Sequence, residues 1–253
     1  MRILLQFALL VSAAVASAGQ PADAVAVRQL QDEAVRALES DDALPLERWA
    51  PLVERLRDAS KRAPTPGERS QLTLLWLRAL RALLQSIPVD AEGQRPYQPW
   101  LDANTSLITY SEPSGQWLIV GEVIWHAHDE HRSTGAAEEI AWLAAENGVP
   151  GECEGYVPCY TSGLNRLEGE YLRRHPDGRH ASEAVKAVRD SLEMSLERLS
   201  EPDGKDYFDP AGRGNCEDLR KTLEPLMDAV RASSGDFRPG AVAAADRLLA
   251  MCR

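Results

Sequence analysis

The segment WHAHDEH, residues 125–131, holds three of the five histidines of the chain together with an aspartate and a glutamate. Imidazole and carboxylate groups are common ligands of zinc and common general acids and bases. The residues His126, His128, Asp129 and His131, with an acid from the following segment such as Glu138 or Glu139, are therefore the candidate ligands of a metal-dependent enzyme. No other stretch of the sequence concentrates such residues to this degree.

The spacing of the histidines decides how many of them can face one ion. In a helix over 120–131, His126 and His128 point about 200° apart and cannot bind one ion together. His128 and His131 would share a face, but two ligands make a weak site. If 123–128 is instead a strand, His126 and His128 share a face and chelation is sensible. Neither HExxH nor HxxEH is present.

The N-terminus has the pattern of a secretory signal peptide. Arg2 precedes the apolar run ILLQFALLVSAAVA, and small residues follow at Ala16, Ser17 and Ala18. We expect cleavage near Ala18, no membrane insertion of the mature chain, and a periplasmic or secreted location in a bacterium. The net charge is −11 and there is no dense run of Lys and Arg, so we expect no nucleic-acid partner.

The chain has four cysteines: Cys153, Cys159, Cys216 and Cys252. An even number in an exported protein indicates two disulfides. Helical spacing places Cys216 at the start of one helix, after Asn215 as its N-cap, and Cys252 at the end of the next. An antiparallel hairpin of these helices pairs Cys216 with Cys252 and leaves Cys153 to pair with Cys159. The C-x5-C spacing fits neither a zinc CxxC pair nor a thioredoxin-like motif.

The hydrophobic pattern predicts a mainly α-helical protein. Apolar residues recur at helical spacing over 22–39, 45–61 and 68–87. The string SLITYSEPSGQWLIV has two β-rich runs around a Pro-Ser-Gly turn, which predicts a short β-hairpin near 107–120. The expected divisions are a signal peptide (1–18), an N-terminal helical region (19–87), an irregular connector with the β-hairpin (88–119), a helix-turn-helix pair (120–200) and a disulfide-linked C-terminal helical hairpin (201–253).

Two parts of the chain match at an offset of 44 residues, where VGEVIWHAHDEHRSTGAAEEIA lies over LNRLEGEYLRRHPDGRHASEAV. Both read as helix, tight turn, helix, and the alignment places His131 on His175. If this is a repeat, His131 is a structural turn residue that is half buried against the second helix of its unit. His126 and His128 are then residues of the helix surface.

The segment EYLRRHPDGRHASEAVKAV resembles the helix–turn–helix junction of tetratricopeptide-like repeats in bacterial envelope proteins, where an aromatic-Pro-Asp-Ser/Gly turn precedes an Ala-rich helix. The residues that carry the match are Tyr171, His175, Pro176, Asp177, Gly178, Ala181 and Ala184. The best match covers 164–186. The match over 120–141 is weaker, since Arg132 replaces the proline and Thr134 the glycine. The 34-residue period of true repeats is absent.

The resemblance implies helical hairpins in a solenoid-like array, whose usual work is to bind protein segments, and it implies no catalytic residue and no cofactor. The sequence also lacks GxSxG, SxxK, Walker and dinucleotide-binding motifs. The leading hypothesis is therefore an exported, non-enzymatic interaction or scaffold module with a protein partner. The alternative is the metal-dependent enzyme. We expect Trp100, Trp117, Trp125 and Trp142 to pack in the core or between helices, rather than to line a pocket.

Overall fold

The computed structural model describes residues 21–40, 44–91 and 93–253, and in this part of the chain it is mainly helical with one two-stranded sheet. The elements are α1 (Pro21–Leu38), α2 (Leu46–Arg62), α3 (Pro66–Ser86), α4 (Gln98–Ala103), β1 (Ile108–Ser111), β2 (Gln116–Ile119), α5 (Gly121–His131), α6 (Ala137–Ala145), α7 (Val157–Arg166), α8 (Glu168–Arg174), α9 (Ala181–Leu199), α10 (Gly204–Tyr207), α11 (Asn215–Ala232) and α12 (Arg238–Ala250).

The signal peptide expected over 1–18, with its cleavage near Ala18, lies outside the described residues. Among the helices that are described, none combines the length and the apolar character needed to cross a bilayer.

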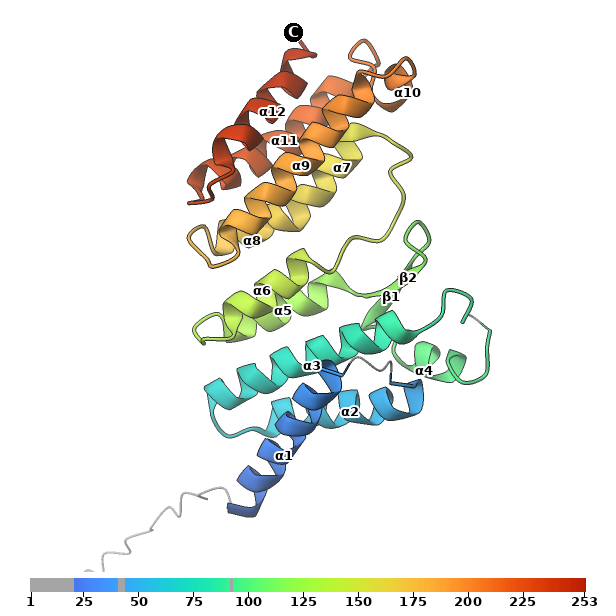
Figure 1. Ribbon diagram of the computed structural model, residues 1–253, viewed down its shortest axis with the longest axis vertical. Coiled ribbons are helices and arrows are strands. Elements are labelled where there is room, and N and C mark those ends of the chain that lie inside the picture. The colour runs from blue at the N-terminus through green and yellow to red at the C-terminus, as the bar shows by residue number, and fades with distance from the viewer. Residues whose placement is uncertain (1–20, 41–43, 92) are drawn as a thin grey trace, which may run out of the picture.

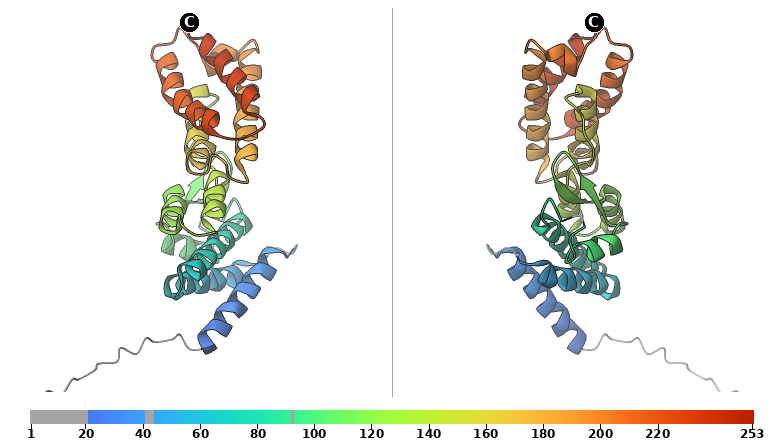
Figure 2. Two further views of the ribbon diagram at one scale, coloured as in Figure 1. Left: turned by 90° about the vertical axis from the view of Figure 1, so that its left-hand side faces the viewer. Right: turned by 90° about the vertical axis from the view of Figure 1, so that its right-hand side faces the viewer.

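The helices are stacked in one long, narrow row, with α1, α2 and α3 at one end and α11 and α12 at the other (Figure 1 and Figure 2). Neighbours in sequence pack as pairs, α2 with α3, α5 with α6, α8 with α9 and α11 with α12. Between pairs, α3 contacts α6, α6 contacts α8, α8 contacts α11, and α9 contacts α12. Each pair therefore lies mainly against the pair before and the pair after it.

The helix α3 is central to the first half, as its apolar residues on more than one face predict. It packs against α1, α2, α5, α6 and β2, and Leu72, Leu77 and Leu80 are fully buried. A capping box fixes its start, because the Thr65 hydroxyl accepts from the backbone N–H of Glu68 and the Glu68 carboxylate accepts from Thr65. Helix formation here is thus supported by both local capping and tertiary burial.

The predicted β-hairpin is present within the connector. The strands β1 and β2 are antiparallel, with Ile108 opposite Ile119, and the rings of Tyr110 and Trp117 are 5.2 Å apart across the ladder. The Asn147 side chain, beyond α6, donates to the carbonyl of Ile119 at 2.6 Å and so holds β2 against the end of α6. The rest of the connector was expected to be irregular, but it contains the short helix α4.

The offset of 44 residues in the sequence reappears in the structure, since α6 begins at Ala137 and α9 begins at Ala181. The first helix of the second unit differs from α5 because it is interrupted at Leu167, between α7 and α8. The hydrophobic pattern did not predict α7. Pro158 and Gly163 within α7 conceal its helical pattern.

Both expected disulfides are present. Cys153 pairs with Cys159 and Cys216 pairs with Cys252, with Cα–Cα distances of 5.5 and 5.6 Å. The second bond joins the start of α11 to the turn after α12, as the hairpin geometry predicts. One detail of the prediction is wrong, because Asn215 is the first residue of α11 and the N-cap is Gly214, whose φ of 86° suits glycine.

The buried apolar residues form two clusters that meet at α6. One cluster joins α1 to α6 and includes Ile140 and Leu143; the other runs from α6 to α12 and includes Ala141 and Ala145. One helix therefore gives one face to each cluster. The side chains around the contact of α5 and α6 with α8 and α9 decide how the two halves are joined.

Candidate functional site

The three histidines of α5 point to three different environments. His126 is exposed, with 76% of its side chain accessible, and its Nε2 lies 3.3 Å from Glu130. His128 is buried against His175, which follows α8. His131 is buried too, and its Nε2 lies 3.0 Å from the Thr73 hydroxyl of α3.

Two expectations for these histidines are wrong. His128 was expected on the helix surface, but only 5% of the residue is exposed. His131 was expected to lie half buried against the second helix of its own unit, whereas it is buried and bonded to Thr73 in α3. Both errors have one cause. The prediction treated α5 and α6 as an isolated hairpin with an outer face in water, whereas α5 lies between α3 and the turn after α8. The neighbouring pairs cover the faces that an isolated hairpin exposes.

We call the group formed by His128, Asp129, Arg174 and His175 the histidine junction. Nε2 of His128 lies 3.0 Å from Nε2 of His175, and the ring centroids are 5.2 Å apart at an angle of 88°. The two rings therefore point their Nε2 atoms at each other, and the remaining ring atoms lie on the far sides of the contact. Burial lowers the pKa of His128, and burial together with the neighbouring His128 lowers the pKa of His175.

Arg174 ties the other side of the junction together. Its Nη1 lies 2.8 Å from Nδ1 of His128 and donates to Asp129, while its Nε donates to Glu170 at 2.6 Å. The guanidinium also lies over the ring of Trp125, with Cζ 4.8 Å from the ring centroid. The hydrogen bond from Arg174 holds the pKa of Asp129 below its usual value. This cation is thus positioned by two carboxylates and one aromatic face.

The turn between α8 and α9 is held by Tyr171. Its hydroxyl donates to Oε1 of Glu138 at 3.0 Å and accepts from the backbone N–H of His180. Gly178 is required by close approach, since a Cβ there would come within 2.4 Å of the Tyr171 hydroxyl and 2.7 Å of Glu138. The carbonyl of Pro176 accepts from the N–H of Ser234, in the turn of the next pair. The predicted turn residues therefore contact each other and both neighbouring pairs.

A second polar group lies beside the junction on α6 and α9. His180 stacks on Trp142, with ring centroids 4.7 Å apart and an interplanar angle of 4°, and its nitrogens contact Glu139 and Glu183. Burial opposes the charged form of His180, but the hydrogen bonds to Glu183 and Glu139 outweigh it and raise its pKa. The surroundings of His180 thus raise its pKa, whereas those of His128 and His175 lower theirs.

The metal-site hypothesis needs several ligands around one point. Within the ranges that the structure describes, no group of three or more His, Cys, Asp or Glu side chains is placed to hold a metal ion. The pair His128 and His175 does not fit an ion between its nitrogens, because rings that meet head-on would need a separation of about 4 Å to give two zinc bonds. His126 and His131 point elsewhere. The geometry of the pair suits a hydrogen bond.

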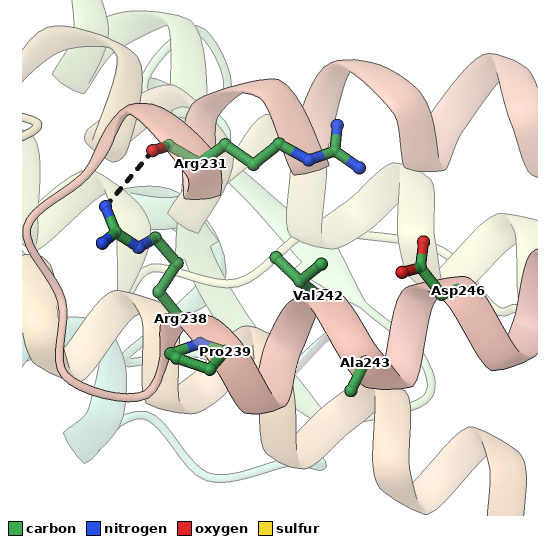
Figure 3. Close-up of a pocket in the computed structure, with 6 residues that line it drawn as sticks. All are labelled: Arg231, Arg238, Pro239, Val242, Ala243 and Asp246. Carbon is green, nitrogen blue, oxygen red and sulfur yellow. Dashed lines mark hydrogen bonds between the residues drawn. The ribbon is translucent and has the colours of Figure 1, made fainter.

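Two grooves offer surfaces for larger ligands. A groove of about 380 Å³ lies where α1, α3 and α6 meet, and Trp142, which packs against the second apolar cluster as expected, also contributes to its lining. Trp100, Trp117 and Trp125 pack against the first apolar cluster, as expected. The second groove, between α11 and α12, is drawn in Figure 3. There Arg238 donates to the carbonyls of Arg231 and Ser233 and so caps the end of α11.

Several residues of these sites were not identified from the sequence: Thr73, Arg174, His180 and the α1 residues of the first groove. Arg174 directly precedes His175, but its role depends on reaching Asp129 across the interface between α5 and α8. Nothing in a single sequence shows that contact.

We compared the chain with protein-family models, with curated proteins and with solved structures, and none of the three comparisons found a match.

Proposed function

We propose that this protein is an exported, non-catalytic interaction module, built from tetratricopeptide-like helical hairpins in a solenoid-like array in the bacterial envelope. The observation that carries the proposal is the single row of helix pairs, each of which contacts mainly its neighbours. Such arrays expose long continuous surfaces, and their usual work is to bind protein segments. The two disulfides support an oxidising compartment, where such bonds form and persist.

The groove between α1, α3 and α6 is the surface best suited to a protein segment. Its lining is apolar in part, and it carries two cations and three anions, one of which is Glu39. The apolar and aromatic lining residues are Val35, Leu38, Leu75, Ala82, Trp142 and Leu143, and the paired charges are Arg78 with Glu139 and Arg81 with Glu146. A groove of this kind fits a peptide that buries apolar side chains and exchanges ion pairs at its edges.

The chain offers a matched pair of variants to test this assignment. Val35 and Val25 are both exposed valines of α1, at 39% and 56%, but only Val35 lines the groove. We expect Val35→Asp to lose an envelope protein that wild-type protein captures after crosslinking, because a carboxylate is placed on the apolar wall. Val25→Asp should keep that protein. Equal capture by both variants would contradict the groove assignment, and absence of any specific partner would contradict the function.

A further inference from the structure

The His128–His175 contact has room for one hydrogen between the two rings. A neutral imidazole has one donor nitrogen and one acceptor nitrogen, whereas the charged form donates from both. At a separation of 3.0 Å between the two Nε2 atoms, one ring donates and the other accepts. If both rings were charged, N–H would face N–H across this distance. The contact is therefore incompatible with two protonated histidines.

The other nitrogen of His128 fixes which ring donates. Nη1 of Arg174 lies 2.8 Å from Nδ1 of His128, and a guanidinium has donors but no acceptor. Nδ1 therefore accepts from Arg174, and the hydrogen of neutral His128 lies on Nε2 and points to His175. Protonation of His128 would add a hydrogen at Nδ1 that faces Arg174. Asp129 Oδ1 lies 3.1 Å from Nδ1 and has a lone pair for such a hydrogen, but the hydrogen would still face Nη1 of Arg174 at 2.8 Å.

The surrounding charges do not remove this conflict. The titratable and charged groups around the pair are Asp129 on α5, Glu138 and Glu139 on α6, Glu170, Tyr171 and Arg174 on α8, and His180 before α9. The carboxylates nearest to the pair have other partners: Asp129 and Glu170 accept from Arg174, and Glu138 accepts from Tyr171 and from the backbone of Arg179. They attract a proton on the pair, yet burial and Arg174 still favour the neutral rings.

We propose that the histidine junction is a pH-sensitive contact between the two halves of the protein, and that protonation of the His128–His175 pair separates α8 from α5. The contact is placed for this role because it joins one helix pair to the next, close to α6, where the two apolar clusters meet. Loss of the contact at one junction in a row of helix pairs alters the relative orientation of everything on either side. The groove proposed above as a protein-binding surface lies on α1, α3 and α6, which is one side of the histidine junction. The pH-sensitive contact therefore does not depend on that groove.

The direction of the pH effect follows from linkage. The pKa of each histidine is lowered in the folded protein, so the separated state takes up protons first as the pH falls below about 6.5. The junction is fully formed above that pH and weakens as the pH falls through the lowered values. His180 acts with the opposite sign, since its raised pKa gives stability at low pH that is lost as the pH rises. The measurement must therefore report on the junction itself.

Hydrogen exchange of the backbone amides of α5 and α8, corrected for the intrinsic pH dependence, reports local opening. From pH 7.5 to 5.5 we expect the opening equilibrium of the wild-type protein to rise by up to about tenfold for each of the two histidines, because their ordinary pKa of about 6.5 lies one unit above the lower pH. The variant His128→Gln/His175→Gln replaces both rings by neutral amides and should show less than about a twofold change. The control His126→Gln, at an exposed histidine of the same helix, should behave as wild type.

The proposal is overturned if wild-type opening is the same at both pH values, or if the double variant keeps the wild-type response. An NMR titration of the wild-type histidines gives a second test that requires no variant and survives a variant that does not fold. His128 and His175 should titrate below the usual histidine range, with coupled shifts in α5 and α8. Titration of the pair within or above that range would equally overturn the proposal.

Discussion

Removal of the disulfide Cys216–Cys252 should destabilise the C-terminal hairpin strongly. The bond closes a loop with a sequence separation of 36, from the start of α11 to the turn after α12. In the chain-entropy model, a loop of this length contributes about 4 kcal/mol, because the bond restricts the unfolded chain. The bond Cys153–Cys159 has a sequence separation of 6, for which the same model gives about 2 kcal/mol.

The perturbation is the double variant Cys216→Ala/Cys252→Ala, which leaves no free thiol from that pair. Cys153→Ala/Cys159→Ala is the matched control. Urea unfolding followed by far-UV circular dichroism gives the free energy of unfolding, and hydrogen exchange shows where the loss occurs. We expect the long-loop variant to lose about twice as much free energy as the short-loop variant. Its first amides to lose protection should lie in α12.

The result that refutes this reasoning is equal destabilisation by the two variants, or a larger loss for the short loop. Either outcome would mean that contacts near the sulfurs, rather than the entropy of the unfolded chain, determine the contribution of each bond. One interaction that remains at the hairpin mouth is the hydrogen bond from Arg220 to the carbonyl of Cys252 at 3.1 Å. That bond alone is expected to contribute about 1 kcal/mol, which cannot replace the disulfide.

Three further variants test other contacts by chemical denaturation. Thr73→Val leaves the buried His131 ring without its partner at 3.0 Å and should cost about 1–3 kcal/mol. Gly155→Ala places a side chain at a φ of 85° and brings its Cβ within 1.8 Å of the Tyr207 ring, so the loss should exceed the roughly 1 kcal/mol of the backbone conformation alone. Burial raises the pKa of Glu168 to about 7, and Glu168→Gln should stabilise the protein by about 1–3 kcal/mol at pH 8 and much less at pH 5.

The first two of these variants have matched controls. His126→Ala removes an exposed histidine of α5 and should change stability by less than about 0.5 kcal/mol. Gly93→Ala has a similar φ of 78° but no atom within 4 Å of the new Cβ, so it isolates the backbone cost. For Glu168, the Oε2 atom is buried without a hydrogen-bond partner, and the folded state therefore prefers the protonated acid. The contribution of Glu168 to the free energy of unfolding therefore rises as the pH falls from 7 toward 4.5. A stability difference between Glu168→Gln and wild type that is the same at pH 8 and pH 5 would contradict this.

The parts of the fold that follow from local chemistry were predictable from the sequence. Helical spacing and proline positions located α1, α2 and α3 to within a few residues, and the Pro-Ser-Gly turn located the β-hairpin. The disulfide pairing followed from two amphipathic helices of similar length that end at cysteines. These features depend on residues close together in the sequence, or on one hairpin folding back on itself.

The junction was not predictable because it depends on contacts between helix pairs. The apolar pattern of α5 gives one buried face, whereas the structure buries His128 on α8 and His131 on α3. A polar residue that is covered by the next pair looks the same in the sequence as one that faces water. The same argument applies to Arg174, whose partner Asp129 lies 45 residues earlier in the chain.

The contacts of the three turns suggest how the pairs are kept in register. His131, at the end of α5, bonds Thr73 in α3; His175, after α8, bonds His128 in α5; and Ser234, after α11, donates to Pro176. In each case a polar group near a turn bonds to the pair before it, while apolar residues fill the space within. Apolar surfaces alone allow neighbouring helices to slide, whereas a buried polar group has a steep penalty if it loses its partner. The two buried contacts, at His131 and His128, therefore select one offset between their pairs, whereas the hydrogen bond of Ser234 is made by an exposed residue. The junction at His128 differs from the other two in that both of its partners can be protonated.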